Sequence, residues 1–172
     1  MNRVATGLII GFVWMLFAPF FFTEWVIHAL MDVSLYSIFM QIGTNPAAGF
    51  ATWFSLGFQG DGSLFTIFSG FGWFFNANTR EIAWMTIMAW LSTGFIIGLI
   101  IRGRKRSTQA VFGVYVTMFA LSLIFAVLSQ ADLASMFTGA NLIDYFGVIL
   151  TGILFSVLGG LLGGSASGAG AD

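Results

Sequence analysis

Side chains that can bind a metal ion recur at every fourth position soon after the first apolar run: Glu24, His28 and Asp32, with Tyr36 continuing the series. Residues four apart share one face of a helix, so a helix here would present two carboxylates and an imidazole to one divalent ion. The same stripe would suit a proton-active site, because histidine titrates near neutral pH. The alternative is an amphipathic helix on the membrane surface that turns its polar side to water. We favour this alternative because the chain has only one histidine.

A second candidate site is the glycine-rich stretch Gln59, Gly60, Asp61 and Gly62, which ends at Ser63 and separates two apolar pieces. Glycines allow backbone carbonyls to turn inward, and an acidic residue at a constriction favours cations. The stretch would therefore suit the filter of a homo-oligomeric cation channel. An ordinary surface turn is the alternative that we favour, since Gly-Asp-Gly is common turn chemistry.

Composition excludes several other kinds of chemistry. Charged residues make up 8% of the chain and hydrophobic residues 58%, whereas soluble proteins carry about 25% charged residues. The absence of cysteine excludes disulfides, thiolate metal sites and cysteine nucleophiles. The long apolar runs contain almost no ionisable residue, although transporters and pumps usually keep such residues at membrane depth. We therefore expect neither a self-contained transporter nor an enzyme, and no cofactor is indicated beyond the divalent metal considered above.

Four apolar runs predict the architecture: residues 4–22, 82–101, 110–128 and 145–162. A run of this length crosses a hydrocarbon core of about 30 Å as a helix. The sequence therefore predicts an all-α integral membrane protein with four transmembrane helices in a single membrane domain, residues 1–172.

The basic residues predict the orientation of these helices. Apart from Arg80, they are Arg3 and a cluster that falls between the second and third runs: Arg102, Arg104, Lys105 and Arg106. Lysine and arginine are retained on the cytoplasmic side of a membrane, which places both termini in the cytoplasm and the chain in the cytoplasmic (plasma) membrane. The cluster would also suit anionic lipid headgroups or an acidic partner. Four charges are too few to predict binding to nucleic acid.

Residues 23–79 form an outer segment that is too long for a turn and too apolar for a solvated loop. It divides into apolar pieces at 25–42, 47–58 and 64–75, and Asn45 before Pro46 predicts a helix start. These pieces are too short to span a membrane, and they suit interfacial helices or a re-entrant hairpin with residues 59–63 at its tip. The tail, residues 163–172, is rich in small residues and is predicted to be flexible.

Small residues recur four apart within the predicted spans: Gly7 and Gly11; Gly94 and Gly98; Gly152, Ser156, Gly160 and Gly164. In lipid, small residues allow helix backbones to approach closely, and this approach is a main source of helix association. We favour packing within one bundle. The alternative is that the stripe in the fourth span faces another subunit.

Taken together, these patterns predict a non-catalytic polytopic membrane subunit or scaffold that assembles with other membrane chains or with itself, among membrane lipids. The first alternative is the homo-oligomeric cation channel with a re-entrant loop at residues 59–63. The second is a metal-dependent membrane enzyme that would use Glu24, His28 and Asp32.

Overall fold

Four long helices make up most of the computed structural model: α1 (Arg3–Phe21), α6 (Ala77–Ile101), α7 (Arg104–Leu128) and α9 (Gly139–Ala166). The structure describes residues 2–24, 26–27, 33–58, 77–132, 134 and 138–168. Each long helix holds a stretch that is long and apolar enough to cross a membrane: Arg3–Phe21, Arg80–Ile101, Arg104–Leu128 and Tyr145–Ala166. The prediction of four such helices is therefore confirmed.

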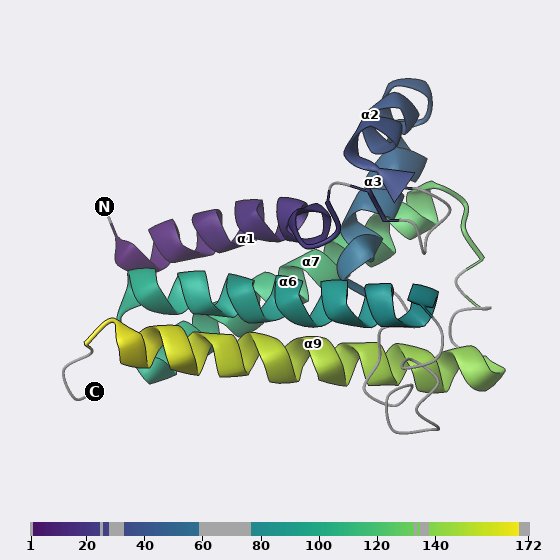
Figure 1. Ribbon diagram of the computed structural model, residues 1–172. Coiled ribbons are helices and arrows are strands. Elements are labelled where there is room, and N and C mark those ends of the chain that lie inside the picture. Colours follow the sequence, from purple (N-terminus) through teal and green to yellow (C-terminus); the bar gives the residue numbers. More distant parts are fainter. Residues whose placement is uncertain are drawn as a thin grey trace.

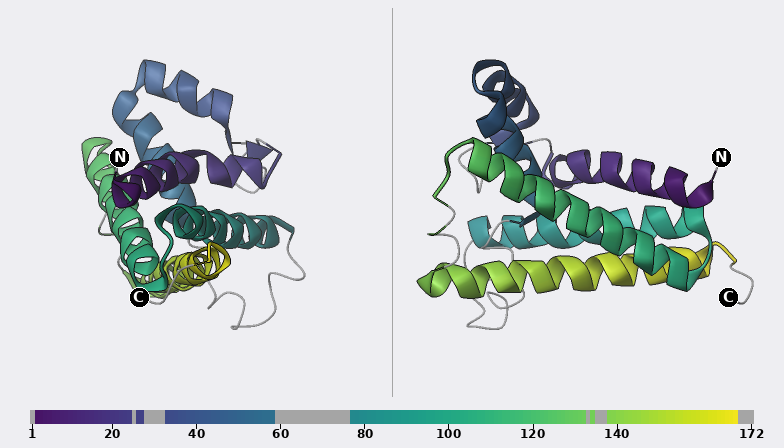
Figure 2. Two further views of the ribbon diagram at one scale, coloured as in Figure 1. Left: turned by 90° about the vertical axis from the view of Figure 1, so that its left-hand side faces the viewer. Right: turned by 180° about the vertical axis from the view of Figure 1, so that it is seen from behind.

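The long helices form a bundle with two distinct ends. Helices α1, α6 and α9 run side by side, and α7 crosses them obliquely (Figures 1 and 2). Helix α6 contacts both α1 and α9, and α7 contacts α9 and α1. The N-terminus of α1, the connection between α6 and α7 and the C-terminus of α9 lie together at one end (Figure 1). We call this the basic end, because the basic cluster lies in it.

The connection between α6 and α7 is shorter than the sequence predicts. Helix α7 begins at Arg104, so Arg104, Lys105 and Arg106 belong to its first turn rather than to a loop. Only Arg102 and Gly103 separate the helices, with φ of 56° and 142°. Glycine tolerates such positive φ at little cost, which permits the sharp reversal. The apolar pattern missed this start because the first turn of α7 is polar.

The C-terminal helix is longer than the sequence predicts. Helix α9 continues to Ala166, so residues 163–166 of the predicted flexible tail are helical. The backbone of Gly163 packs against that of Phe95 in α6, and Gly164 packs against the backbone of Arg104 in α7. The side chain of Arg104 also donates a 3.0 Å hydrogen bond from Nε to Ser165 Oγ. These tertiary contacts order residues whose composition favours a flexible chain.

The outer segment begins with a short strand pair instead of the helix expected from residue 25. Strands β1 (Val26–Ile27) and β2 (Val33–Ser34) pair antiparallel, with Ile27 opposite Val33. Helix α2 (Leu35–Thr44) starts only after Ser34, whose hydroxyl accepts a 3.0 Å hydrogen bond from the Ser37 backbone N–H. The Ser37 hydroxyl accepts in turn from the Ser34 N–H at 2.9 Å. This reciprocal cap fixes the helix start at Ser34.

Helix α3 (Pro46–Ser55) starts where the Asn45-Pro46 pair predicts, and the Asn45 side chain accepts a 3.2 Å hydrogen bond from the Ala48 N–H. A 3₁₀ turn, η2 (Leu56–Phe58), follows it into the bundle. Gly49 packs so closely on Ile42 that an added Cβ would lie 2.6 Å from the Ile42 backbone nitrogen. Helices α2 and α3 therefore form a tight hairpin, residues 35–55, which we call the arm. It projects sideways from the bundle near the end opposite the basic end (Figure 1).

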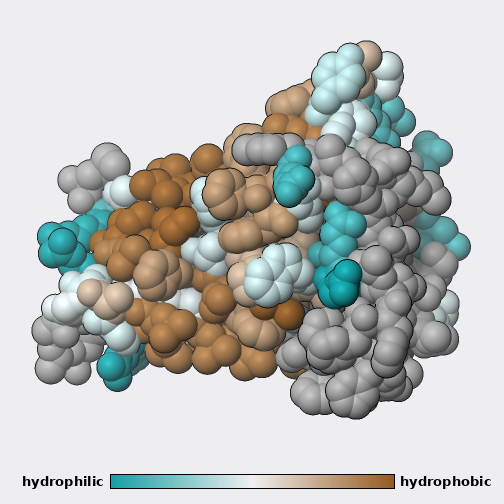
Figure 3. All heavy atoms as spheres, in the orientation of Figure 1, coloured by the Kyte–Doolittle hydropathy of each residue, from teal (hydrophilic) through white to brown (hydrophobic). Residues whose placement is uncertain are grey.

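The exterior of the bundle is apolar as well as its interior. Large apolar side chains are exposed along the long helices, among them Ile9 (63%), Phe112 (49%) and Leu162 (57%). On the face drawn in Figure 3, hydrophobic residues cover much of the bundle beside a hydrophilic patch at the basic end. Water would penalise such a surface, whereas lipid chains would not. The four long helices thus indicate a membrane location.

Candidate functional site

The predicted metal site lies largely outside the described residues. Glu24 follows α1 with a φ of 53° and is exposed, whereas His28 and Asp32 are not among the residues that the structure describes. The prediction of one continuous helix that would align these side chains is wrong, because strands β1 and β2 occupy residues 26–27 and 33–34. Within the described ranges, no group of three or more histidine or acidic residues could hold a metal ion.

The predicted filter, Gln59, Gly60, Asp61 and Gly62, also lies outside the described residues. The chain that leads to it is anchored in the bundle, since Leu56 and Phe58 are 1% and 2% exposed. The channel hypothesis therefore stays a prediction.

The small residues of α6 and α9 lie against one another. A Cβ built at Gly98 would lie 2.5 Å from the Gly164 nitrogen and 2.7 Å from the Gly160 oxygen. A Cβ at Gly94 would lie 2.8 Å from the Gly160 nitrogen and would overlap the Ser156 oxygen. The two backbones are thus in direct contact over two turns, which only glycine permits on the α6 side.

The rest of the fourth-span stripe is also covered by this chain. Gly152 packs against the ring of Tyr115, and Gly160 packs against Val111, both in α7. Ser156 is 1% exposed. The stripe consequently has no surface left for a second subunit. In α1, Gly7 and Gly11 pack against the side chains of Ile101 and Ile97 of α6.

A buried aromatic cluster, which the sequence did not reveal, joins the 3₁₀ turn to three helices. The ring of Trp90 is fully buried, 4.7 Å from the ring of Tyr115 and 5.6 Å from that of Phe58. Its Nε1–H donates to the Gly57 carbonyl at 3.0 Å. The Tyr115 hydroxyl donates to the Ile149 carbonyl of α9 at 3.1 Å. Tryptophan and tyrosine in mid-span, away from the interfaces they usually prefer, are the signal that could have indicated buried partners.

Five of the six basic residues gather at the basic end, whereas Arg80 lies near the start of α6 at the opposite end. Arg3 begins α1, Arg102 follows α6, and Arg104, Lys105 and Arg106 form the first turn of α7; all are exposed. The positive end of a helix dipole opposes cations by about 0.3–1 kcal/mol each, so helix stability does not account for three of them there.

The arm carries an exposed apolar face near the opposite end. Its inward side packs on the bundle: Ile38 of α2 is 1% exposed in a cluster with Phe20 and Met85, and Phe54 of α3 stacks on Phe125 of α7 at 5.4 Å. On α2, Tyr36 is 73% exposed, Phe39 51% and Met40 55%. Both sides of α2 are apolar, so the sequence pattern did not distinguish this outward face from the inward one.

The chain matches no protein-family model, no curated protein and no solved structure.

Proposed function

We propose that this chain is a non-catalytic polytopic membrane subunit or scaffold, which assembles through its arm with another membrane chain or with itself. The proposal places it in the cytoplasmic membrane with its basic end in the cytoplasm. The outer segment then lies at the opposite face of the membrane, where α2 and α3 run along the surface.

The exposed face of α2 is the observation that carries the proposal. Tyr36, Phe39 and Met40 stand away from the bundle, near the end of the transmembrane helices, where lipid chains give way to headgroups and water. Leaving apolar surface there costs about 25 cal/mol per Å², so a covering chain would be stabilised. The interior of the bundle supports the same function, because it is filled by packing contacts: the close backbone contact between α6 and α9, and the aromatic cluster.

We expect the double substitution Tyr36→Ser and Met40→Ser to disperse the assembly. Each side chain contributes about 1.5–3 kcal/mol when buried, so the pair would weaken association by at least about 100-fold. The matched control is Phe146→Ser with Leu150→Ser, a second pair four residues apart on α9 that is 58% and 50% exposed. Native mass spectrometry after gentle extraction would compare wild type and both variants.

The proposal requires that wild type and the control remain assembled while the arm variant yields single chains of 18.6 kDa. A wild type that is already a single chain would refute it. Equal dispersal by both variants would show that the arm is not the contact.

The orientation can be tested with single cysteines, because the chain has none of its own. Ala131 follows α7 and Ala166 ends α9, and both are exposed at opposite ends of the bundle. We expect a membrane-impermeant maleimide to label Ala131→Cys in intact cells, and Ala166→Cys only after permeabilisation. The reverse pattern would overturn the orientation that the basic residues predict.

A further inference from the structure

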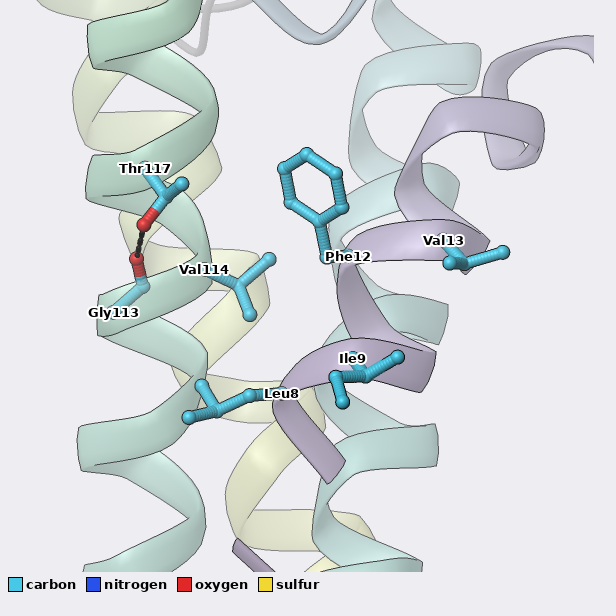
Figure 4. Close-up of a pocket in the computed structure, with 7 residues that line it drawn as sticks. All are labelled: Leu8, Ile9, Phe12, Val13, Gly113, Val114 and Thr117. Carbon is cyan, nitrogen blue, oxygen red and sulfur yellow. Dashed lines mark hydrogen bonds between the residues drawn. The ribbon is translucent and has the colours of Figure 1, made fainter. Parts of the chain in front are cut away.

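A groove of about 290 Å³ opens on the side of the bundle between α1 and α7. Its walls are Leu8, Ile9, Phe12 and Val13 of α1 and Gly113, Val114 and Thr117 of α7. Figure 4 shows Leu8 and Val114 pointing toward each other across it. The Thr117 hydroxyl donates to the Gly113 carbonyl at 2.8 Å, so the one polar side chain of the groove is already paired.

Gly113 keeps the groove open. A Cβ at this position would have only Leu8 Cδ2 within 4 Å, at 3.9 Å. It therefore differs from Gly94 and Gly98, whose missing side chains allow another backbone to approach. At Gly113 the missing side chain leaves space on the outer surface of a helix that is long and apolar enough to cross a membrane.

Arg106 lies on the same face of α7 as this opening. Gly113 and Thr117 follow it by seven and eleven residues, two and three helical turns, which puts them about 10 and 16 Å along the axis. Arg106 is exposed at the basic end. A positive charge thus stands at the membrane surface, in line with an apolar groove at membrane depth.

We propose that the groove and Arg106 together bind one anionic phospholipid, with an acyl chain between α1 and α7 and the phosphate at the guanidinium. The groove, at about 290 Å³, is too small for a whole lipid and suits a single acyl chain. Arginine presents a planar fork of donors that matches phosphate oxygens. An apolar helix of another chain could also pack against the walls of the groove, but it would leave the charge of Arg106 without a role.

The test is lipid retention by the purified full chain in detergent, measured by native mass spectrometry. Phosphatidylglycerol and phosphatidylcholine with identical acyl chains are titrated separately. We expect one retained phosphatidylglycerol. Arg106→Gln should weaken its binding about fivefold, the equivalent of one headgroup charge contact. Gly113→Phe should abolish it by filling the groove.

Two matched variants separate the site from general effects. Lys105→Gln removes a neighbouring charge that lies about 100° from Arg106 around the axis of α7. Val116→Phe adds the same ring to the same helix at a position that is 46% exposed and does not line the groove. Both should bind phosphatidylglycerol as the wild type does.

Several outcomes would overturn the proposal. One is equal retention of phosphatidylcholine and phosphatidylglycerol. A second is an equal loss of phosphatidylglycerol binding in Arg106→Gln and Lys105→Gln. A third is full retention of phosphatidylglycerol by Gly113→Phe. A dimer that Gly113→Phe alone dissociates would assign the groove to a second copy of the chain. Lipid binding can fail while the arm-dependent assembly persists, so the two proposals are distinguishable.

Discussion

Replacing Gly94 by alanine is expected to destabilise the bundle by about 3 kcal/mol, the upper end of the range for overpacking. The added methyl group would overlap the Ser156 carbonyl oxygen and lie 2.8 Å from the Gly160 nitrogen. Both are backbone atoms of α9, so relief requires the two helices to separate. Separation would also loosen the neighbouring contact at Gly98. Thermal unfolding in detergent, followed by the loss of the monodisperse peak in size-exclusion chromatography, would measure the effect.

The matched control is Gly113→Ala, the same change in the middle of α7. Its new methyl group would make only an ordinary contact with Leu8 Cδ2 at 3.9 Å. Alanine in a helix interior is favoured over glycine by about 0.5–1 kcal/mol, so this variant should match or exceed the stability of the wild type. Equal stabilities for the two variants would contradict the direct backbone contact between α6 and α9.

The second large effect is expected for Trp90→Ala, which should cost about 3–5 kcal/mol. Trp90 is fully buried, and its ring contacts those of Phe58 and Tyr115. Truncation would leave a cavity and also remove the N–H that satisfies the Gly57 carbonyl at 3.0 Å. The 3₁₀ turn would then lose its hydrogen bond to α6 and the ring contact of Phe58 with that helix. Unfolding temperature in detergent and protease sensitivity of the outer segment would report the two consequences.

Trp84→Ala provides the control on the same helix. Trp84 is 53% exposed, less than two turns from Trp90, so its removal should change stability by less than about 0.5 kcal/mol. The intermediate variant Trp90→Phe keeps most of the apolar volume but leaves the Gly57 carbonyl unpaired, at a cost of about 1–3 kcal/mol. If Trp84→Ala and Trp90→Ala unfold at the same temperature, the aromatic cluster does not anchor the 3₁₀ turn.

The order and approximate limits of the four long helices follow from the sequence alone. Apolar length is a local property, and a membrane-spanning helix satisfies its backbone hydrogen bonds within itself. The Asn45-Pro46 helix start is local for the same reason, because the cap involves only Asn45 and the following turn. The charge difference between the two ends of the bundle also follows from the sequence, since five of the six basic residues, all except Arg80, adjoin the helix ends that meet there.

Tertiary structure decided everything that depends on a partner distant in sequence. Glycines at four-residue spacing indicate close packing but do not identify the partner, and the fold assigned the stripe of α9 to α6 and α7 of the same chain. The helical end of α9 depends on Phe95 and Arg104, which lie far away in sequence. Strands β1 and β2, residues 26–27 and 33–34, stand where a helix was expected, because the apolar content of this segment is compatible with either structure. The groove depends on how far apart α1 and α7 lie beside Gly113, and no local sequence pattern encodes the distance between two helices.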